Sequence, residues 1–201
     1  MTSGLREFYQ RLLAPLVGLL FAWGISPMAI TVLGTAATVA ASLWFFPRGQ
    51  AVVGTVVVLA CLLGDGIDGQ LARLGNRETR FGAFLDSTLD RMADAAVFLG
   101  IAWWRLREGD DIGLGLSLAV LVAGSLVSYA RARAEAEGWN ASVGLFERAD
   151  RLLFSLGGVF AMGLEAPVWV LWLALAVVAV GSAVTVGQRI AAAARAASTV
   201  A

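Results

Sequence analysis

The chain has 201 residues with 15 basic and 15 acidic side chains; 59% of its residues are hydrophobic, and its mean hydropathy is +0.77. Only 15% of the residues are charged, against about 25% in soluble domains, so the composition excludes an ordinary soluble domain. The apolar content also excludes disorder, and a single cysteine excludes a disulfide-stapled scaffold. Histidine and lysine are absent, which rules out histidine-dependent catalysis and His-ligated zinc, and no basic tail indicates a nucleic-acid partner.

The first predicted element is a helix over residues 2–23 that lies along the membrane interface. Its uncharged part, residues 12–24, is too short to span a bilayer comfortably, and charged residues precede it. The apolar side of this amphipathic helix is formed by Phe8, Leu12, Leu13 and Leu16. A signal peptide is the alternative, although no clear small-x-small cleavage site precedes the next apolar run.

Long uncharged segments separated by Pro, Gly and Asn then predict a bundle of transmembrane helices over residues 27–189, followed by a C-terminal tail over 190–201. The expected fold is an all-α integral membrane protein with one membrane domain, residues 1–201. The six predicted spans are 27–46, 51–74, 80–104, 112–134, 147–164 and 167–189.

Arginine placement predicts the orientation of the bundle. If both termini lie on one side, eleven arginines share that side: Arg6, Arg11, Arg73, Arg77, Arg80, Arg131, Arg133, Arg148, Arg151, Arg189 and Arg195. Arg48, Arg105 and Arg107 lie on the other side, and Arg91 falls inside the third span. The positive-inside rule therefore predicts cytoplasmic termini in a cell membrane.

Two pairs of aspartates are the most informative feature of the sequence. Asp65 and Asp68 are i,i+3 neighbours near the end of the second span, and Asp86 and Asp90 are i,i+4 neighbours near the start of the third. Each pair shares a helix face, and a short turn makes the two helices antiparallel. We therefore expect the four carboxylates to meet at a similar depth.

A cluster of four acids without lysine or histidine favours a divalent metal site. Each acid at membrane depth costs about 2.5–3.5 kcal/mol on insertion scales, so either some are protonated or cations lie between them. Oxygen ligands at this density suit two Mg²⁺ ions, with Mn²⁺ as the alternative, at the spacing used for phosphoryl transfer. Gly69 and Gly82 would leave room for a substrate and for close helix packing.

Other interpretations of the aspartates remain open. The acids could pair with nearby arginines in a structural membrane scaffold, or line the permeation path of a divalent-cation channel or transporter. The aspartates cluster at one end of two helices rather than across the membrane, which argues against a channel or transporter.

The segment over residues 65–90 resembles the motif of the CDP-alcohol phosphotransferases, Asp-x-x-Asp-Gly-x-x-Ala-Arg, eight residues, then Gly-x-x-x-Asp-x-x-x-Asp. Every fixed position matches: Asp65, Asp68, Gly69, Ala72, Arg73, Gly82, Asp86 and Asp90. The resemblance covers essentially the whole chain. It implies a dimeric integral membrane enzyme that uses divalent metal to displace CMP from a CDP-linked lipid with an alcohol.

The resemblance also implies individual roles. Asp65 and Asp86 would contact both metals, Asp68 the first and Asp90 the second, and Asp90 would also accept the proton of the attacking hydroxyl as the catalytic base. The CDP-lipid contacts would be Pro27, Met28, Ala29, Ile30, Thr31, Gly69, Ala72, Arg73, Thr79 and Gly82. The stretch after Pro27 departs from the family, in which a polar residue often follows the proline.

Arginines at the ends of three predicted spans favour an acceptor that carries phosphate, because arginine binds phosphate through a planar fork. Their alternative roles are topology and lipid binding. Three strings, over residues 79–82, 128–136 and 144–152, resemble the actinobacterial phosphatidylinositol phosphate synthases, with Arg131 in place of a frequent lysine and Ala149 in place of proline. By this similarity, the acceptor phosphate would be bound by Ser128, Arg131, Arg133, Arg151 and Arg189.

The predicted function is therefore phospholipid synthesis from CDP-diacylglycerol and myo-inositol phosphate, giving phosphatidylinositol phosphate and CMP. The expected enzyme is a multi-pass homodimer of a bacterial cell membrane, in contact with membrane lipids and with its active site on the cytoplasmic side. A phosphatidylglycerophosphate synthase that uses glycerol 3-phosphate is the alternative within the same family.

Overall fold

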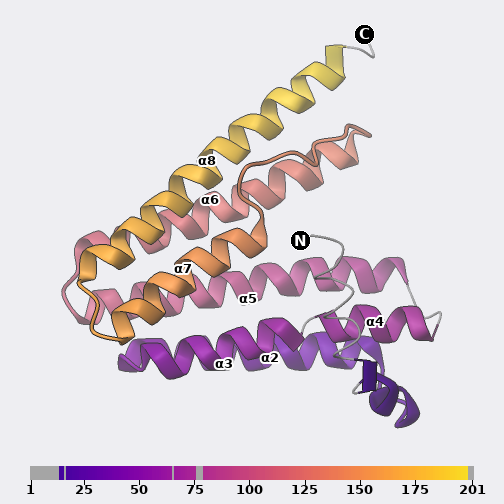
Figure 1. Ribbon diagram of the computed structural model, residues 1–201. Helices are drawn as coiled ribbons and strands as arrows, with labels where there is room; N and C mark the ends of the chain where they lie inside the picture. The colour runs from indigo at the N-terminus through magenta and orange to yellow at the C-terminus, as the bar shows by residue number, and fades with distance from the viewer. Residues whose placement is uncertain (1–13, 16, 65, 76–78, 199–201) are drawn as a thin grey trace. The chain divides into compact units, whose positions relative to one another are not determined.

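A computed structural model describes residues 14–15, 17–64, 66–75 and 79–198; the side chains of Gly66, Asp68, Ala72 and Arg73 lie outside the described part. Every regular element in these ranges is helical (Figure 1). The elements are α2 (Pro27–Phe45), the 3₁₀ turn η1 (Phe46–Arg48), α3 (Ala51–Gly64), α4 (Gly66–Leu74), α5 (Arg80–Arg107), α6 (Asp111–Ala136), α7 (Arg148–Gly163) and α8 (Val168–Ser198).

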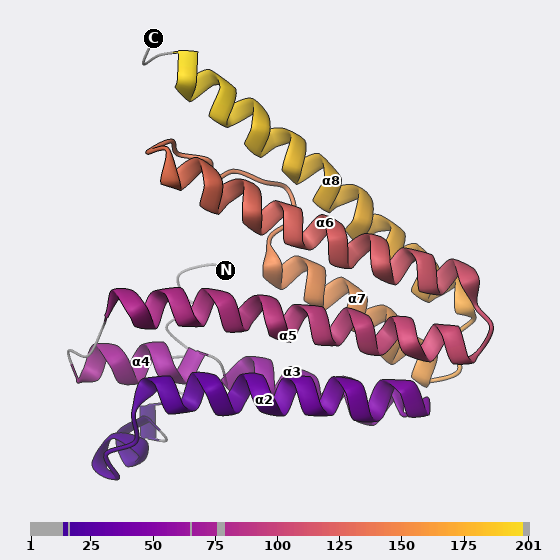
Figure 2. The same cartoon turned by 180° about the vertical axis from the view of Figure 1, so that it is seen from behind.

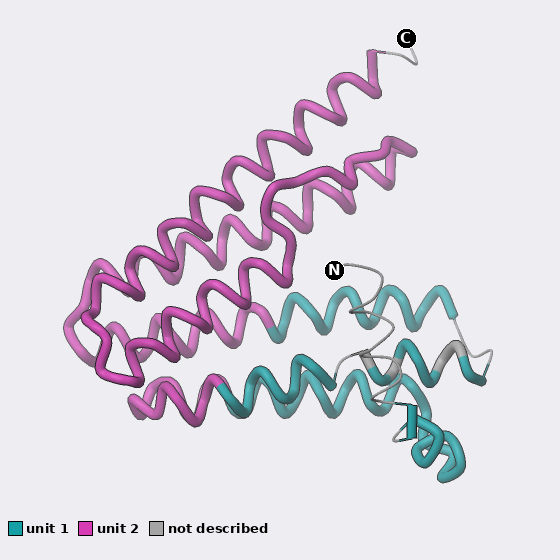
Figure 3. Tube along the Cα trace, in the orientation of Figure 1, with its two compact units in different colours: residues 1–41, 56–93 teal, residues 42–55, 94–201 magenta. Residues whose placement is uncertain are grey.

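The chain forms two compact units, shown in Figure 3. Unit 1 comprises residues 1–41 and 56–93, and unit 2 comprises residues 42–55 and 94–201. Three helices pass from one unit into the other, so each unit is described by itself. The prediction of one membrane domain stays a prediction.

The core of unit 1 fixes the face of α4. Ile67 and Leu71 are i,i+4 neighbours, and both are buried against Val17, with Leu20 and Ile30 packed around them. This apolar stripe therefore sets which face of α4 packs into the core of unit 1.

In unit 2, Gly54 of α3 and Gly100 of α5 allow close packing against the end of α2 and the turn that follows it. Phe46 is fully buried, and a Cβ added at Gly54 would lie 2.9 Å from its ring. A Cβ added at Gly100 would lie 2.5 Å from the carbonyl oxygen of Ser42. Glycine at position 54 thus leaves room for the Phe46 ring, and glycine at position 100 lets α5 approach the backbone of α2 closely.

A buried polar network joins helix ends in unit 2. Asp110 caps α6 by accepting from the Gly113 amide at 2.9 Å, and it also accepts from Arg105 Nε at 2.8 Å and Trp172 Nε1 at 2.9 Å. Arg105 is only 4% exposed, and it also contacts Met162 Sδ. Burial by itself would raise the pKa of Asp110, but the hydrogen bonds from Gly113, Trp172 and Arg105 hold it below its usual value.

At the other end of unit 2, the segment between α6 and α7 folds back onto α8. The amide of Phe146 donates to Thr185 Oγ1 at 3.0 Å, and that of Leu145 donates to Gln188 Oε1 at 3.0 Å. The ring of Phe146 fills the space left by Gly181, where an added Cβ would lie 2.5 Å from it. Helices α6 and α8 lie side by side, as the view from behind shows (Figure 2).

Four helical segments are long and apolar enough to cross a membrane: Pro27–Arg48, Ala51–Leu71, Asp111–Ala136 and Val168–Ser198. They correspond to the first, second, fourth and sixth predicted spans. Among the described helices, α5 and α7 do not meet this standard, because α5 carries several charges and α7 has only 16 residues. The protein is thus all-helical in its described part, with apolar helices typical of a membrane protein.

Of the predicted boundaries, the end of the last span differs from the structure. The second predicted span, 51–74, matches a helical segment that runs from Ala51 to Leu71; its described parts are α3 and α4, and Asp65 lies outside the described residues. The predicted tail over 190–201 is helical as far as Ser198, because its alanines are strong helix formers and simply extend α8. Of the predicted interfacial helix, residues 14, 15 and 17–22 are helical, whereas Phe8, Leu12, Leu13 and Leu16 lie outside the described residues.

Candidate functional site

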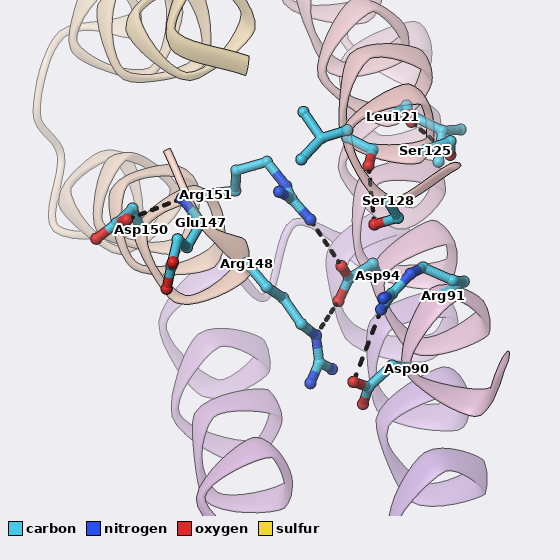
Figure 4. A network of polar contacts seen from close by, with 12 residues as sticks. Asp90, Arg91, Asp94, Leu121, Ser125, Ser128, Glu147, Arg148, Asp150 and Arg151 are labelled. Carbon is cyan, nitrogen blue, oxygen red and sulfur yellow. Dashed lines mark hydrogen bonds and ion pairs between the residues drawn. The ribbon is translucent and has the colours of Figure 1, made fainter. Parts of the chain in front are cut away.

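Helix α5 carries Asp86 and Asp90 one turn apart on one face, as predicted. The helix begins at a cap in which Thr79 Oγ1 accepts from the Gly82 amide at 2.9 Å. Both aspartates are half-buried, and Asp90 forms a 3.7 Å ion pair with Arg91 (Figure 4). The cap therefore fixes where α5 starts, and the helical repeat then brings both carboxylates to the same side.

Gly82 and Thr79 have a structural role in addition to any contact with substrate. A Cβ added at Gly82 would lie 3.0 Å from Thr79 Oγ1, which is tighter than most Cβ contacts. Glycine at this position therefore leaves room for the capping hydroxyl. The predicted CDP contacts of these two residues stay predictions.

Of the other predicted aspartate pair, Asp68 belongs to α4. Asp68 and Ala72 are i,i+4 residues of this helix, and Gly69 is half-buried. Asp65 lies outside the described residues, as do the side chains of Asp68, Ala72 and Arg73. Among the side chains that are described, no group of three or more acidic or cysteine residues forms a metal cluster.

The described donors fit a hard divalent cation. Asp86 and Asp90 offer carboxylate oxygens on one helix face, and the whole chain lacks histidine, which leaves oxygen as the main ligand type. Two half-buried carboxylates on adjacent turns repel each other, and a divalent cation would remove that repulsion. The meeting of all four aspartates stays a prediction.

The stretch Pro27–Thr31 forms the first turn of α2. Ser26 caps this helix, because its Oγ accepts from the Ala29 amide at 3.1 Å. Met28 is 42% exposed, whereas Thr31 is buried and donates its hydroxyl to the Pro27 carbonyl at 3.1 Å. Ile30 packs against the core of unit 1. Of the predicted CDP contacts in this turn, Met28 thus has the most accessible side chain.

Two of the five residues predicted to bind the acceptor phosphate meet at Gly124 of α6. Ser128 donates to the Gly124 carbonyl at 3.3 Å, and Arg151 packs so closely that a Cβ at Gly124 would lie 3.0 Å from its Nε. Arg151 is 2% exposed. The Arg151 guanidinium also reaches Asp94 Oδ2 at 3.5 Å, and Arg148 Nε reaches Asp94 Oδ1 at 3.0 Å (Figure 4).

Arg189 of α8 lies beside the same part of α6. Its guanidinium donates to the carbonyl of Val127 from Nη1 and to that of Val143 from Nε at 2.9 Å, and the residue is 6% exposed. These bonds attach the segment that follows α6 to both α6 and α8. Arg189 thus contacts α6 at Val127, one residue before Ser128 in the chain.

Arg131 and Arg133 differ from the buried arginines. Both side chains are more than half exposed, and each forms an i,i+4 ion pair, with Glu135 and Glu137 respectively. Arg133 nevertheless lines a pocket of about 460 Å³ between α6 and α8 that Arg189 also lines. The structure thus places Ser128, Arg151 and Arg189 around α6 residues 124–128 and leaves the other two at the accessible end of the helix.

Asp94 is a buried charged residue that the sequence analysis missed. It is 8% exposed and accepts from two arginines of α7. A signal for it was present, since Asp86, Asp90 and Asp94 continue one i,i+4 series along α5. The identity of its partners, 54 and 57 residues away, could not be read from that series.

The profile of the CDP-alcohol phosphatidyltransferase family matches residues 24–180. The chain belongs to this family of transferases, which confirms the class predicted from the aspartate motif. The phosphatidylinositol phosphate synthase of Streptomyces avermitilis is 44% identical over 192 residues, which cover 92% of this chain and 79% of the relative.

Solved structures agree with this assignment. The Mycobacterium tuberculosis phosphatidylinositol phosphate synthase with CDP-DAG bound matches at a TM-score of 0.86 and 37% identity, covering 91% of this chain and 94% of that one. The same enzyme in complex with manganese and citrate matches at a TM-score of 0.84 and 37% identity, covering 89% and 87% of the two chains.

Proposed function

We propose that the protein transfers the phosphatidyl group from CDP-diacylglycerol to myo-inositol phosphate and releases CMP. The observation that carries this proposal is the whole-chain likeness, in sequence and in structure, to synthases of phosphatidylinositol phosphate, one of them with CDP-DAG bound. The intact aspartate motif and the helix-borne pair Asp86 and Asp90 support it.

The metal-binding residues of the proposed site are Asp65, Asp68, Asp86 and Asp90. A divalent cation, Mg²⁺ or Mn²⁺, would neutralise the pyrophosphate and stabilise the departing CMP. A relative in complex with manganese supports this choice of ion. Two ions are proposed because four carboxylates supply enough ligands for both.

Asp90 is proposed to accept the proton of the attacking inositol hydroxyl. Histidine and lysine are absent, so a carboxylate is the expected base, and Asp90 is half-buried where its oxygens keep some access. The CDP moiety would lie against Gly69, Arg73, Thr79 and the first turn of α2.

On the acceptor side, we propose that Ser128, Arg151 and Arg189 bind the phosphate of inositol phosphate directly. They gather around residues 124–128 of α6, and two of them are buried guanidinium groups. Arg131 and Arg133, which are exposed and paired with glutamates, would attract the anion to the site.

The membrane arrangement is also a proposal beyond the four apolar helices. α5 and α7 would complete six spans. The acidic residues of α5 would lie against the metal, and the arginines of α7 would be buried within the protein. Arg105 and Arg107 lie in the last turn of α5, the end of this helix that the proposed topology assigns to the non-cytoplasmic side. We further propose cytoplasmic termini, an interfacial first helix and a homodimer.

The test is an acceptor competition with the purified protein. Labelled CDP-diacylglycerol, Mg²⁺, inositol phosphate and glycerol 3-phosphate are incubated together, and the lipid products are separated. Phosphatidylinositol phosphate should dominate, and EDTA should stop its formation until Mg²⁺ or Mn²⁺ is restored. If phosphatidylglycerophosphate is the main product, the family assignment stands, but inositol phosphate is rejected as the acceptor. Absence of any lipid product with both acceptors would reject the proposed function.

A further inference from the structure

Asp94 follows Asp90 by one turn on α5 but lies outside the aspartate motif. Its side chain is 11% exposed, and its two oxygens contact different partners: Oδ1 accepts from Arg148 Nε at 3.0 Å, and Oδ2 lies 3.5 Å from Arg151 Nη2. Figure 4 shows this carboxylate between the two guanidinium groups. All three residues belong to unit 2.

The two arginines need an anion at this place. Arg148 and Arg151 are i,i+3 neighbours in the first turn of α7, where the helix dipole is positive and therefore unfavourable for cations. Glu147 and Asp150 form the capping box of this helix and so satisfy backbone amides. Asp94 supplies such an anion from another helix and contacts both guanidinium groups.

The contact with Asp94 also orients Arg151. A guanidinium holds its five N–H donors in a rigid plane, so fixing Nη2 against a carboxylate directs the remaining donors. The Nε side of the same group lies against Gly124, where a methyl group would come within 3.0 Å. The carboxylate on one side and the α6 backbone on the other thus leave Arg151 little rotational freedom.

We propose that Asp94 is a positioning residue for the acceptor: it aligns Arg151 so that the guanidinium meets the acceptor phosphate beside Ser128. This inference rests on the proposed function, which assigns Arg151 to that phosphate. Asp94 does not touch the substrate in this proposal and acts through Arg151.

The test compares the KM for inositol phosphate, the KM for CDP-diacylglycerol and the Tm in four single variants. Asp94→Asn removes the charge, and Asp94→Glu keeps the charge but moves the carboxylate by one methylene group. Gly124→Ala crowds Arg151 from the opposite side without altering any charge. Asp111→Asn is the matched control, because it removes an exposed aspartate from the same unit.

Asp94→Asn and Asp94→Glu should each raise the KM for inositol phosphate roughly tenfold, as expected when one hydrogen bond to a charged group is misaligned. Gly124→Ala should raise it in the same direction. The KM for CDP-diacylglycerol should change less than about twofold in these variants, and both KM values should change less than about twofold in the Asp111→Asn control. If Asp94→Asn does not accumulate in the membrane, Asp94→Glu gives the same comparison with the charge preserved.

A double-variant cycle separates positioning from a general structural role. In an Arg151→Ala background, Asp94→Asn should add no further increase in the KM for inositol phosphate, because the guanidinium that Asp94 positions has been removed. A further increase there, or a loss of Tm and kcat with both KM values unchanged, would overturn the inference. If Arg151→Ala raises the KM for inositol phosphate but Asp94→Asn leaves it unchanged, the positioning role of Asp94 is overturned, whereas the proposed function stands. An unchanged KM in Arg151→Ala would reject both the acceptor role of Arg151 and this inference.

Discussion

The network around Asp110 should stabilise one end of unit 2, and Asp110→Asn is the sharpest perturbation of it. The side chains of Arg105 and Asp110 are 4% and 10% exposed, so the pair is shielded from water. Removing one partner of a buried ion pair costs about 3–5 kcal/mol. Asparagine keeps one oxygen for Gly113 or Trp172, so we expect a loss near the lower limit, about 3 kcal/mol.

Thermal unfolding in detergent measures this loss. At about 2–4 °C per kcal/mol for a chain of this size, Asp110→Asn should lower Tm by roughly 6–12 °C. Asp111→Asn is a matched control on the neighbouring residue, which is exposed in the first turn of α6. It should lose about 1 kcal/mol at most, from a weaker interaction with the helix dipole. Equal Tm values for the two variants would refute the stabilising role of the buried network.

The same network predicts a pH dependence. The pKa of Asp110 is lower in the folded protein than its usual value of 3.8, so its contribution to stability is present above that value. This contribution is lost as the pH falls below 3.8 and through the folded pKa. The Tm difference between wild type and Asp110→Asn should therefore be constant from pH 7 to about pH 5 and shrink below pH 4. A difference that persists undiminished at pH 3 would contradict this assignment.

Three further predictions concern the site and its support. Asp86→Asn should abolish transfer in a folded, inserted protein, because it removes a proposed ligand of both ions, and near-native activity with Mg²⁺ would exclude the two-metal site. Arg189→Ala should raise the KM for inositol phosphate by about ten- to a hundredfold, whereas the exposed Arg133→Ala should raise it less than about threefold; equal increases would show that Arg133 contributes to acceptor binding as much as Arg189 does. Gly100→Ala should cost about 1–3 kcal/mol, because its methyl group would meet the Ser42 carbonyl, whereas Gly115→Ala, with open space around it, should not destabilise; equal Tm values would show that the contact relaxes freely.

Local patterns in the sequence were enough to predict the class and most of the helices. Charge-free stretches bounded by Pro and Gly gave the four apolar helices, because a membrane span is defined by length and hydropathy. The i,i+4 spacing of Asp86 and Asp90 gave their common face for the same kind of local reason. The motif over residues 65–90 gave the family, which the comparisons confirm.

Helix ends were predicted less well, because boundaries depend on caps and on neighbouring helices. The alanines after Arg189 extend α8 to Ser198, although the sequence suggested a tail. Phe46 and Gly100 belong to one close contact that no periodicity in either segment reveals. Such contacts depend on the shapes of two surfaces that are distant in sequence.

The roles of the arginines show most clearly what the tertiary structure decides. From the sequence, Arg131, Arg133, Arg151 and Arg189 all belonged to one set of cations at helix ends. In the folded chain, Arg131 and Arg133 pair within their own helix, whereas Arg151 is buried beside Asp94, 57 residues away, and Arg189 holds two backbone carbonyls. The sequence determined where positive charge is available, because that depends only on residue type and helical spacing. Packing decided which charges are buried and held in place, because burial and long-range pairing exist only once the helices are assembled.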